Sequence, residues 1–290
     1  MRATRAQLAD ARRLQRRADR YRQGRFLSAG PAAVREARAA GWVREVFLAE
    51  DLSAGLGAEF GPETWRADVH CSYAAADAVA GLAGTRSAPG LVAVCEMHTA
   101  ALADLYPVPD SPGPPPPGVR QRTGWRVDIG LVGISDPGNA GTIIRAAHAV
   151  GAGAVLLLGE TVDPFNEKCV RAAAGSVCHI PLALVPQPLS AIAAARRAGW
   201  RILAAAATGA DVRTVTPVLG SHRHLWLVGE ETHGLPSPIE EHADALISLP
   251  MPGGTESLNA AMAATVLLYQ SRFARERRGH REPGDWTLRD

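Results

Sequence analysis

The sequence lacks the features that would assign it to a membrane-spanning, secreted or disulfide-rich class. Its 290 residues contain no uninterrupted apolar run of the roughly 18 residues that a membrane-spanning helix needs. The N-terminal stretch is rich in arginine and has no apolar segment of the signal-peptide kind. The four cysteines form no CxxC pair, and we expect them to be reduced and buried. We therefore expect a soluble, cytoplasmic protein with no membrane partner.

Patterns for metal ions and for common nucleotide sites are also missing. His222 and His224 form an isolated HxH before a strand, with no further ligand at zinc-site spacing, so we expect no metal. The chain has neither a GxxxxGK[ST] phosphate loop nor a GxSxG nucleophile turn. The pair Gly151 and Gly153 follows a helix and precedes a strand, which is the reverse of the Rossmann order. We interpret it as a helix end and turn.

Lysine is almost absent, and the basic residues are unevenly distributed. Of the 31 basic residues only Lys168 is a lysine, and the net charge of the whole chain is +2. The first 30 residues nevertheless hold nine arginines against Asp10 and Asp19, a local balance of 9 − 2 = +7. Such a basic segment on a near-neutral chain favours an anionic polymer as partner. The alternative is an ordinary solvated helical face.

A proline-rich segment divides the chain. Residues 107–124 include the run Pro114–Pro117, and proline excludes both helix and central strand there. We expect residues 1–106 to form one domain, 107–124 a linker and 125–275 a second domain, followed by a polar tail at 276–290. With 47% apolar and 21% charged residues, both domains can bury a core.

Short apolar runs alternate with helical patterns, which predicts an α/β fold with a parallel sheet in the second domain. In the first domain we expect an Arg-rich helix before residue 25, a helix at Pro31–Gly41 and strands at Arg25–Ala29, Val43–Leu48 and Leu91–Met97. In the second we expect strands at Val127–Ile134, Ala154–Leu158, Arg201–Ala206, Leu225–Val228 and Ala245–Leu249. The expected helices are Gly141–Val150, Glu167–Ala173, Ser190–Ala198 and Ser257–Ala274.

Three polar, glycine-rich loops follow predicted strands of the second domain, at residues 135–145, 228–236 and 249–259. Each loop alone is compatible with a simple turn, because Asp, Asn, Gly and Pro all favour turns. Open α/β sheets bind ligands at the carboxyl ends of their strands, where all three loops are expected to lie. Together they indicate a binding site.

The three loops carry residue patterns at fixed spacing. The first loop has the pattern N-x-G-x-x-x-R at Asn139, Gly141 and Arg145. The other two have G-x-E-x-x-G at Gly229, Glu231 and Gly234, L-P-M at Leu249–Met251 and S-L-N at Ser257–Asn259. These patterns resemble the SpoU (TrmH-like) RNA ribose 2′-O-methyltransferases of the SPOUT superfamily. The stretch Gly24–Arg38 is similar to the start of a ribosomal-protein-like RNA-binding domain that many of these enzymes carry.

The resemblance implies a specific fold and function. The expected fold is α/β, with a C-terminal parallel-sheet SPOUT domain containing a deep trefoil knot and a smaller N-terminal α/β RNA-binding domain. The implied activity is 2′-O-methylation of RNA with S-adenosylmethionine as cofactor, by a homodimer. The separate N-terminal domain favours large-subunit ribosomal RNA over the alternative, transfer RNA. A non-catalytic RNA-binding or ribosome-assembly protein is the second alternative, and intact Arg145, Glu231 and Asn259 argue against it.

Roles for individual residues follow from the same resemblance. The residues expected to act in catalysis are Arg145, Asn139, Glu231, Ser257 and Asn259. Those expected to contact the cofactor are Gly229, Leu249, Met251, Leu258 and Asn259. Arginine suits bidentate binding of the target phosphate, and the identity of the proton acceptor stays open because arginine remains protonated in proteins. At position 229 a glycine is expected to let the cofactor approach closely.

Three departures from the family pattern are visible. Glu230 stands where the family frequently has Asn or Ser, and Leu249 stands where it has Ile before Pro-Met, which should preserve an apolar wall. The third concerns a lost hydroxyl. A family stretch that usually reads R-A-S-x-G has Ala173 in the place of the serine, so any role of that hydroxyl is lost.

Overall fold

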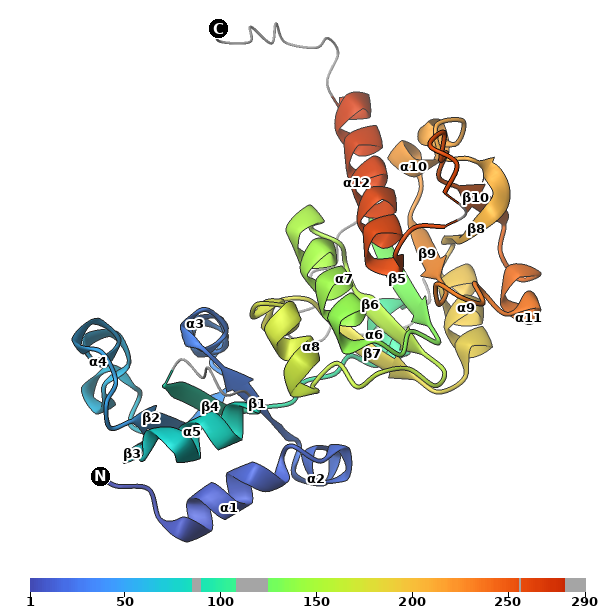
Figure 1. Cartoon of the computed structure of the whole chain (residues 1–290). Coiled ribbons are helices and arrows are strands. Elements are labelled where there is room, and N and C mark those ends of the chain that lie inside the picture. Colours follow the sequence, from blue (N-terminus) through green and yellow to red (C-terminus); the bar gives the residue numbers. More distant parts are fainter. Residues whose placement is uncertain (85–89, 108–124, 256, 280–290) are drawn as a thin grey trace, which may run out of the picture. The chain divides into compact units, whose positions relative to one another are not determined.

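The computed structural model of the chain describes residues 1–84, 90–107, 125–255 and 257–279 (Figure 1). The chain divides into two compact units. The first contains Met1–Thr99, Ser135–His148 and Val162–Leu182, and the second contains Ala100–Ile134, Ala149–Thr161 and the residues from Ala183 onward. Among the described helices, none is both long enough and apolar enough to cross a membrane.

The first unit is built on a four-stranded sheet with the order β1-β4-β2-β3. The strands are β1 (Arg25–Ala29), β2 (Val43–Ala49), β3 (His70–Ala74) and β4 (Leu91–Glu96). Strand β4 runs antiparallel to both of its neighbours, and β2 and β3 are parallel. The predicted strands at 25–29, 43–48 and 91–97 are confirmed, whereas β3 was not predicted.

Helices cover both faces of this sheet (Figure 1). Helices α1 (Arg5–Arg13) and α5 (Ala76–Ala83) bury Ala11, Val79 and Leu82 in one cluster with Phe47 and Val92 of the sheet. Helix α3 (Pro31–Ala39) packs against β1, β2 and β4. The remaining elements before β3 are α2 (Arg17–Gln23), α4 (Ala54–Phe60) and the 3-10 turn η1 (Pro62–Thr64). The N-terminal α/β architecture agrees with the prediction.

The first unit also contains most of α7 (Pro137–Val150), together with α8 (Glu167–Ala172) and the 3-10 turn η2 (Ser176–Cys178). Sequence patterns predicted a helix from Gly141, but α7 begins four residues earlier. The reason is that Asp136 caps the helix: its side chain accepts from Asn139 N at 2.7 Å and its carbonyl accepts from Ala140 N at 3.1 Å. Pro137 suits the first helical position, where no donor is needed. Asn139 therefore lies on the first turn of α7 and not in a loop.

The second unit is built on a six-stranded sheet with the order β10-β8-β9-β5-β6-β7. The strands are β5 (Val127–Val132), β6 (Val155–Leu158), β7 (Leu182–Val185), β8 (Arg201–Asp211), β9 (His224–Val228) and β10 (Ala245–Ser248). The pairs β10–β8, β8–β9, β9–β5 and β5–β6 are parallel. Strands β5, β6 and β9 are buried along their whole length, as expected for a sheet covered on both faces. The predicted parallel α/β sheet is confirmed, and only β7 was not predicted.

Helices α6 (Leu102–Leu105) and α9 (Pro188–Arg197) share a core with β6, β8 and β9. The other helices of the unit are α10 (Thr216–Ser221), α11 (Ser237–Glu240) and α12 (Ala260–Gly279). Helix α12 begins three residues later than predicted because the Asn259 side chain accepts from Ala261 N at 3.0 Å, which caps the helix. It also runs past the predicted end at Ala274, into the segment assigned to a polar tail. Residues 280–290 of that tail lie outside the described residues.

Both flanks of the predicted linker belong to the second unit. Tyr106 packs edge-on against Trp200, with ring centroids 5.1 Å apart. Trp125 donates from Nε1 to the carbonyl of Leu219 at 2.5 Å. The chain is thus held in the same unit immediately before and after residues 108–124, which themselves lie outside the described residues.

Candidate active site

The second unit contains a cavity of about 230 Å³ where the second and third predicted loops meet. Its wall is formed by the loop after β9, the loop after β10, the start of α12 and residues 205–208 of β8, just beyond the point where β8 stops pairing with β9. This is the carboxyl-end location expected for a ligand in a parallel sheet. Six predicted site residues line it: Gly229, Glu231, Leu249, Met251, Ser257 and Leu258.

The loop after β9 is a tight turn that requires glycine at two positions. Gly234 has a φ of 65°, a left-handed conformation, and its N–H donates to the carbonyl of Glu230 at 2.8 Å. A Cβ at position 229 would overlap the carbonyl of Gly234 and lie 2.7 Å from Leu235 N. The expectation that Gly229 is small to admit a cofactor is therefore incomplete, because the loop's own backbone already forbids a side chain there.

Glu231 connects this loop to the start of α12. Its Oε1 accepts from Asn259 Nδ2 at 2.5 Å and from Ala260 N at 3.0 Å. The carboxylate thus lies at a helix N-terminus, where free amides and the helix dipole favour negative charge. Asn259 uses its other side-chain atom, Oδ1, to cap the same helix. Two residues predicted as catalytic are therefore held together by the start of α12.

The two remaining predicted residues, Asn139 and Arg145, lie on α7 in the first unit. The predicted helix Gly141–Val150 would place Arg145 near a helix start, but Arg145 lies about two turns beyond the first residue of α7. The free amides of the first turn therefore do not act beside it. Its side chain is exposed and has no hydrogen bond or ion pair with any residue that the structure describes. The guanidinium is thus available to an external anion.

The glycine of the first motif has a packing role. A Cβ at Gly141 would lie 2.6 Å from Ala172 Cβ and would overlap the carbonyl of Cys169, both on α8. Helices α7 and α8 can approach this closely only because position 141 has no side chain. In the motif that departs from the family pattern, Ala173 is fully buried directly after α8. A buried methyl group there fits the packing and exposes no hydroxyl.

The site also includes residues that no sequence motif indicated. Glu240 of α11 and residues 205–208 of β8 line the cavity. The β8 residues have small side chains in a featureless run, so only their place beyond the paired part of a central strand could have suggested them. His224, which the HxH pattern singled out, is buried in the core and bonds to His222 O and Ser271 Oγ. In the described part of the chain, no three acidic, histidine or cysteine residues form a metal-binding group.

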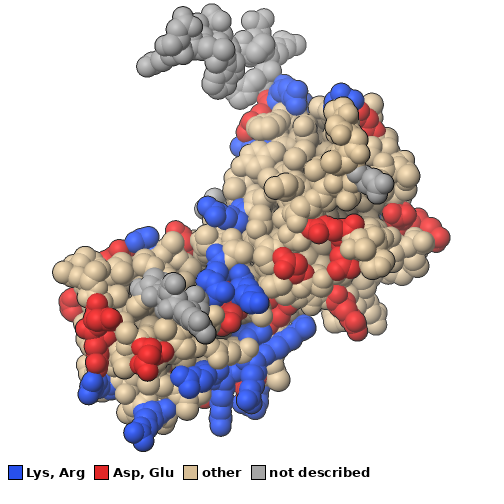
Figure 2. Space-filling view, viewed as in Figure 1, with Lys and Arg blue, Asp and Glu red and all other residues tan. Residues whose placement is uncertain are grey.

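A basic surface lies on α1, α2 and the start of β1. Figure 2 shows Arg and Lys side chains gathered over the region that α1 and α2 occupy in Figure 1. Of the nine N-terminal arginines, Arg2 and Arg22 form ion pairs with acidic residues and Arg20 is buried. The others are exposed and form no ion pair within the described residues: Arg5, Arg12, Arg13, Arg16, Arg17 and Arg25. Unpaired guanidinium groups in such density favour binding to phosphates.

Comparisons with known proteins match both the sheet and the motifs. The SpoU rRNA Methylase family matches residues 126–269. The 23S rRNA (guanosine(2553)-2′-O)-methyltransferase RlmP of Bacillus subtilis is 29% identical over 265 residues, covering 91% of this chain and 94% of that protein. The 23S rRNA (uridine(2479)-2′-O)-methyltransferase of Streptomyces viridochromogenes is 36% identical over 143 residues, about half of each chain, at 47% and 49%.

A solved structure is similar over nearly the whole chain. The SpoU methyltransferase AviRb from Streptomyces viridochromogenes, in complex with the cofactor AdoMet, has a TM-score of 0.77 and 28% identity. The similarity covers 95% of this chain and 100% of that chain, so it includes the N-terminal residues as well as the parallel sheet.

Proposed function

The chain belongs to the SpoU rRNA methylase family, and we propose that it transfers the methyl group of S-adenosylmethionine to a ribose 2′-oxygen of large-subunit ribosomal RNA. The observation that carries this proposal is the cavity beyond β9 and β10, because residues of two separate family motifs line it together. Two relatives are named as 23S rRNA 2′-O-methyltransferases, which favours ribosomal RNA as the substrate.

The cavity suits S-adenosylmethionine chemically. Leu249, Met251 and Leu258 offer an apolar wall for an adenosine, and the backbone at Gly229 is accessible from the cavity. Glu231 and Glu240 also line this cavity, and their negative charge favours a ligand with net positive charge. When bound, the cofactor supplies an electrophilic methyl group on a sulfonium. We propose that these residues and Asn259 hold it.

We propose that the chain's own residues orient the ribose and its phosphate. Arg145, exposed and without a partner among the described side chains, binds the target phosphate through paired N–H donors. The linked pair Glu231 and Asn259 fixes the loop beside the cavity, where Ser257 offers a hydroxyl to the ribose. Asn139, on the first turn of α7, orients the same substrate. The chief catalytic gain is then alignment of the 2′-hydroxyl with the methyl group.

The N-terminal residues are proposed to bind RNA. Six exposed arginines on α1, α2 and β1 supply phosphate contacts that do not depend on sequence and weaken with salt. In functional terms we divide the chain into an RNA-binding part at 1–106, a linker at 107–124, a methyltransferase part at 125–275 and a tail at 276–290. We further propose that the protein acts in the cytoplasm, where ribosomal RNA is modified.

An exposed apolar stripe on α12 supports a homodimer. Met262, Val266, Tyr269 and Phe273 follow a helical spacing of three or four residues and are 63%, 40%, 37% and 46% exposed. A contiguous apolar stripe of this kind is unusual on a monomer and marks a protein contact. We propose that a second copy of the chain covers it. We also propose that the C-terminal segment forms the trefoil knot implied by family membership.

Cofactor binding tests the proposal directly. Isothermal titration with S-adenosylmethionine is compared for the wild-type protein, Leu258→Trp and Leu189→Trp. Leu258 lines the cavity and is 37% exposed, whereas Leu189 on α9 is 41% exposed and does not line it, so the second variant is a matched control. We expect Leu258→Trp to weaken binding at least tenfold and Leu189→Trp to bind as the wild type. Equal binding by all three would place the cofactor elsewhere.

Methyl transfer is then measured on transcripts of 23S rRNA and of transfer RNA. We expect product only with 23S rRNA, on a ribose, and a loss of about 100-fold or more in Arg145→Ala with cofactor affinity retained. Methylation of transfer RNA instead would show that the assignment of ribosomal RNA as substrate is wrong. Cofactor binding without any methylation would favour a non-catalytic RNA-binding role. Near-normal activity in Arg145→Ala would refute the assignment of this residue.

A further inference from the structure

Within the first unit, a buried ion pair joins the basic N-terminal helices to the segment that precedes α8. Asp163 Oδ2 accepts from Arg20 Nε at 2.9 Å and from Arg20 Nη2 at 2.5 Å, and both side chains are only 4% exposed. The other carboxylate oxygen accepts from Tyr21 OH at 3.0 Å and from the backbone N of Phe165 at 2.9 Å. Asp163 thus holds two consecutive residues of α2.

Both members of the ion pair have their remaining hydrogen-bonding groups bound to protein atoms, so the pair fixes the position of α2 closely. The remaining guanidinium nitrogen of Arg20, Nη1, donates to the carbonyls of Leu14 and Gln15 at 2.8 and 2.9 Å. Burial and the nearby carboxylate raise the pKa of Tyr21, so its phenol stays protonated and remains a donor. A buried ion pair contributes little net stability compared with well-packed apolar residues. Its best-supported role in proteins is to select one arrangement among several.

Asp163 is followed by a segment that is packed on two sides. Phe165 lies against Phe26 of β1, with ring centroids 5.2 Å apart, and Arg171 donates to the carbonyl of Ala83 at 3.0 Å. On its other side, α8 contacts α7 so closely that Gly141 admits no side chain. Helix α7 carries Asn139 and Arg145. A continuous path of tight contacts therefore runs from α2 through residues 163–172 to the helix that bears the proposed phosphate-binding arginine.

Helix α2 is also part of the basic surface. Arg16, next to the start of α2, and Arg17 on its first turn are exposed, and the guanidinium of Arg17 lies over the Tyr21 ring at 5.6 Å from its centroid. One short helix thus presents exposed guanidinium groups at its first turn and, in its middle, two consecutive residues bound to Asp163. RNA that binds the exposed arginines would therefore bind the same helix that Asp163 holds in place.

We propose that Asp163 is a positioning residue, which transmits the placement of RNA on α2 to Asn139 and Arg145 on α7. This inference rests on the proposed function. It assigns Asp163 no contact with substrate: the residue sets where α7 stands relative to RNA that is already bound. Its loss therefore lowers the rate of methylation at saturating RNA and leaves the affinities for RNA and cofactor unchanged.

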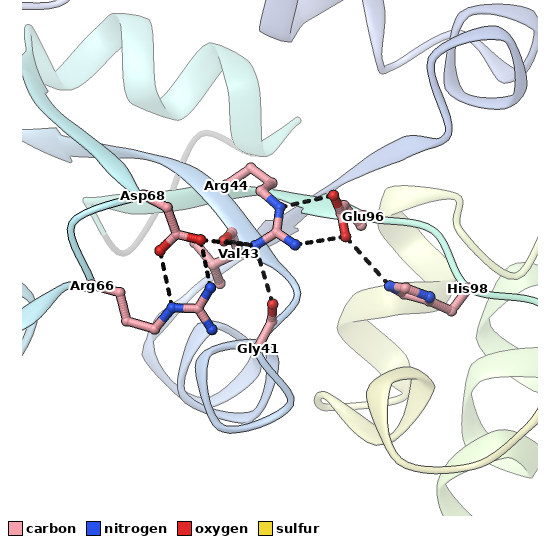
Figure 3. A network of polar contacts seen from close by, with 7 residues as sticks. All are labelled: Gly41, Val43, Arg44, Arg66, Asp68, Glu96 and His98. Carbon is pink, nitrogen blue, oxygen red and sulfur yellow. Dashed lines mark hydrogen bonds and ion pairs between the residues drawn. The ribbon is translucent and has the colours of Figure 1, made fainter. Parts of the chain in front are cut away.

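The test compares Asp163→Asn and Tyr21→Phe with a control from the same unit. Tyr21→Phe removes one hydroxyl from the carboxylate and leaves the ion pair, so it remains informative if Asp163→Asn does not fold. The control is Glu96→Gln. Glu96 accepts from Arg44 at 2.8 Å through each of two nitrogens and also pairs with His98, in a network that includes no residue of segment 163–172 (Figure 3).

For each folded variant, kcat and KM are measured with a 23S rRNA transcript, together with the Kd for that transcript and for S-adenosylmethionine. We expect kcat to fall at least tenfold in Asp163→Asn and two- to fivefold in Tyr21→Phe, with both Kd values within twofold of wild type and Glu96→Gln unaffected. A lower melting temperature with unchanged kcat would show a merely structural role and overturn the proposal. A rise in the Kd for RNA with unchanged kcat would also overturn it, because Asp163 would then serve binding.

Amide hydrogen exchange in α7 separates failure of this inference from failure of the proposed function. We expect residues 137–148 to exchange faster in Asp163→Asn than in wild type, and at the wild-type rate in Glu96→Gln, whether or not an RNA substrate is known. If wild-type protein methylates no RNA, the proposed function fails, and the exchange comparison still decides whether Asp163 stabilises α7. Identical exchange in α7 for Asp163→Asn and wild type would refute the coupling.

Discussion

His224 makes the stability of the second unit depend on pH. It begins β9, is completely buried, and bonds through Nδ1 to the carbonyl of His222 at 2.9 Å and through Nε2 to Ser271 Oγ at 2.8 Å. The carbonyl can only accept, so Nδ1 carries the proton of the neutral ring. Burial lowers the pKa of His224 to about 4, because an imidazolium at this position loses its hydration and the hydrogen bond to the His222 carbonyl offsets only part of that loss.

The direction and size of the effect follow from linkage. Above the pKa of about 6.5 that His224 has in the unfolded chain, its ring is neutral in both the folded and the unfolded protein, and its titration does not change the free energy of unfolding. As the pH falls below that value the unfolded chain takes up a proton that the folded chain refuses until about pH 4, so stability is lost. A shift of roughly two and a half pKa units corresponds to about 3 kcal/mol, of which about 2.5 kcal/mol is lost by pH 4.5.

Urea unfolding at a series of pH values, at one protein concentration, measures this loss in wild type and in His224→Asn. The variant is less stable at pH 7.5 because it fits the buried site less well, but it has no group to titrate there. The gap between the two proteins should therefore narrow by about 2.5 kcal/mol on going to pH 4.5. Parallel pH profiles would show that His224 is protonated in the folded protein and would refute the reasoning.

Three further outcomes follow from contacts described above. Gly141→Ala should lower the free energy of unfolding by about 1–3 kcal/mol in urea melts, because overlap with α8 outweighs the better helix propensity of alanine. Its control is Gly57→Ala in α4, where the space around the residue is open. This variant should raise the free energy of unfolding by up to about 1 kcal/mol. Arg126→Met leaves the buried carboxylate of Asp128 without its ion-pair partner, and burial already raises the pKa of this carboxyl. The variant should lose about 3 kcal/mol of unfolding free energy at pH 7 in urea melts. The loss should become smaller toward pH 5, because the carboxyl is then protonated. Phe273→Glu on the exposed face of α12 should convert the proposed dimer to a monomer in light scattering, and a dimer mass that the substitution leaves unchanged would locate the contact elsewhere.

Strand prediction succeeded where burial is continuous. Strands β5, β6 and β9 are uninterrupted apolar runs because both of their faces are covered, and the sequence shows this directly. Strand β3 was missed because only two of its five residues are buried, so its pattern resembles a loop. Strand β7 lies directly between Pro181 and Pro186, and prolines so close together favour a turn or loop over a strand.

Helix ends and strand order depend on contacts that no local pattern contains. The start of α7 was predicted four residues late because Asn139 and Gly138 suggest a turn, although Asp136 and Pro137 form a good helix start. The placement of β8 between β9 and β10 depends on packing across the whole unit. For this reason residues 205–208 and Glu240 could not be assigned to the cavity from the sequence, although the two motif-bearing loops could.

The motif residues divide into two kinds that the sequence alone does not separate. Gly141 and Gly229 were interpreted as parts of functional motifs. At each position, however, a side chain would overlap protein backbone, so the fold itself requires both glycines whether or not a ligand is bound. Arg145 is the opposite case: it is exposed, no described residue pairs with it, and nothing in the fold explains it. A residue that the fold does not need is the better candidate for chemistry. Replacing the glycines therefore tests folding, whereas Arg145→Ala tests function with the fold intact.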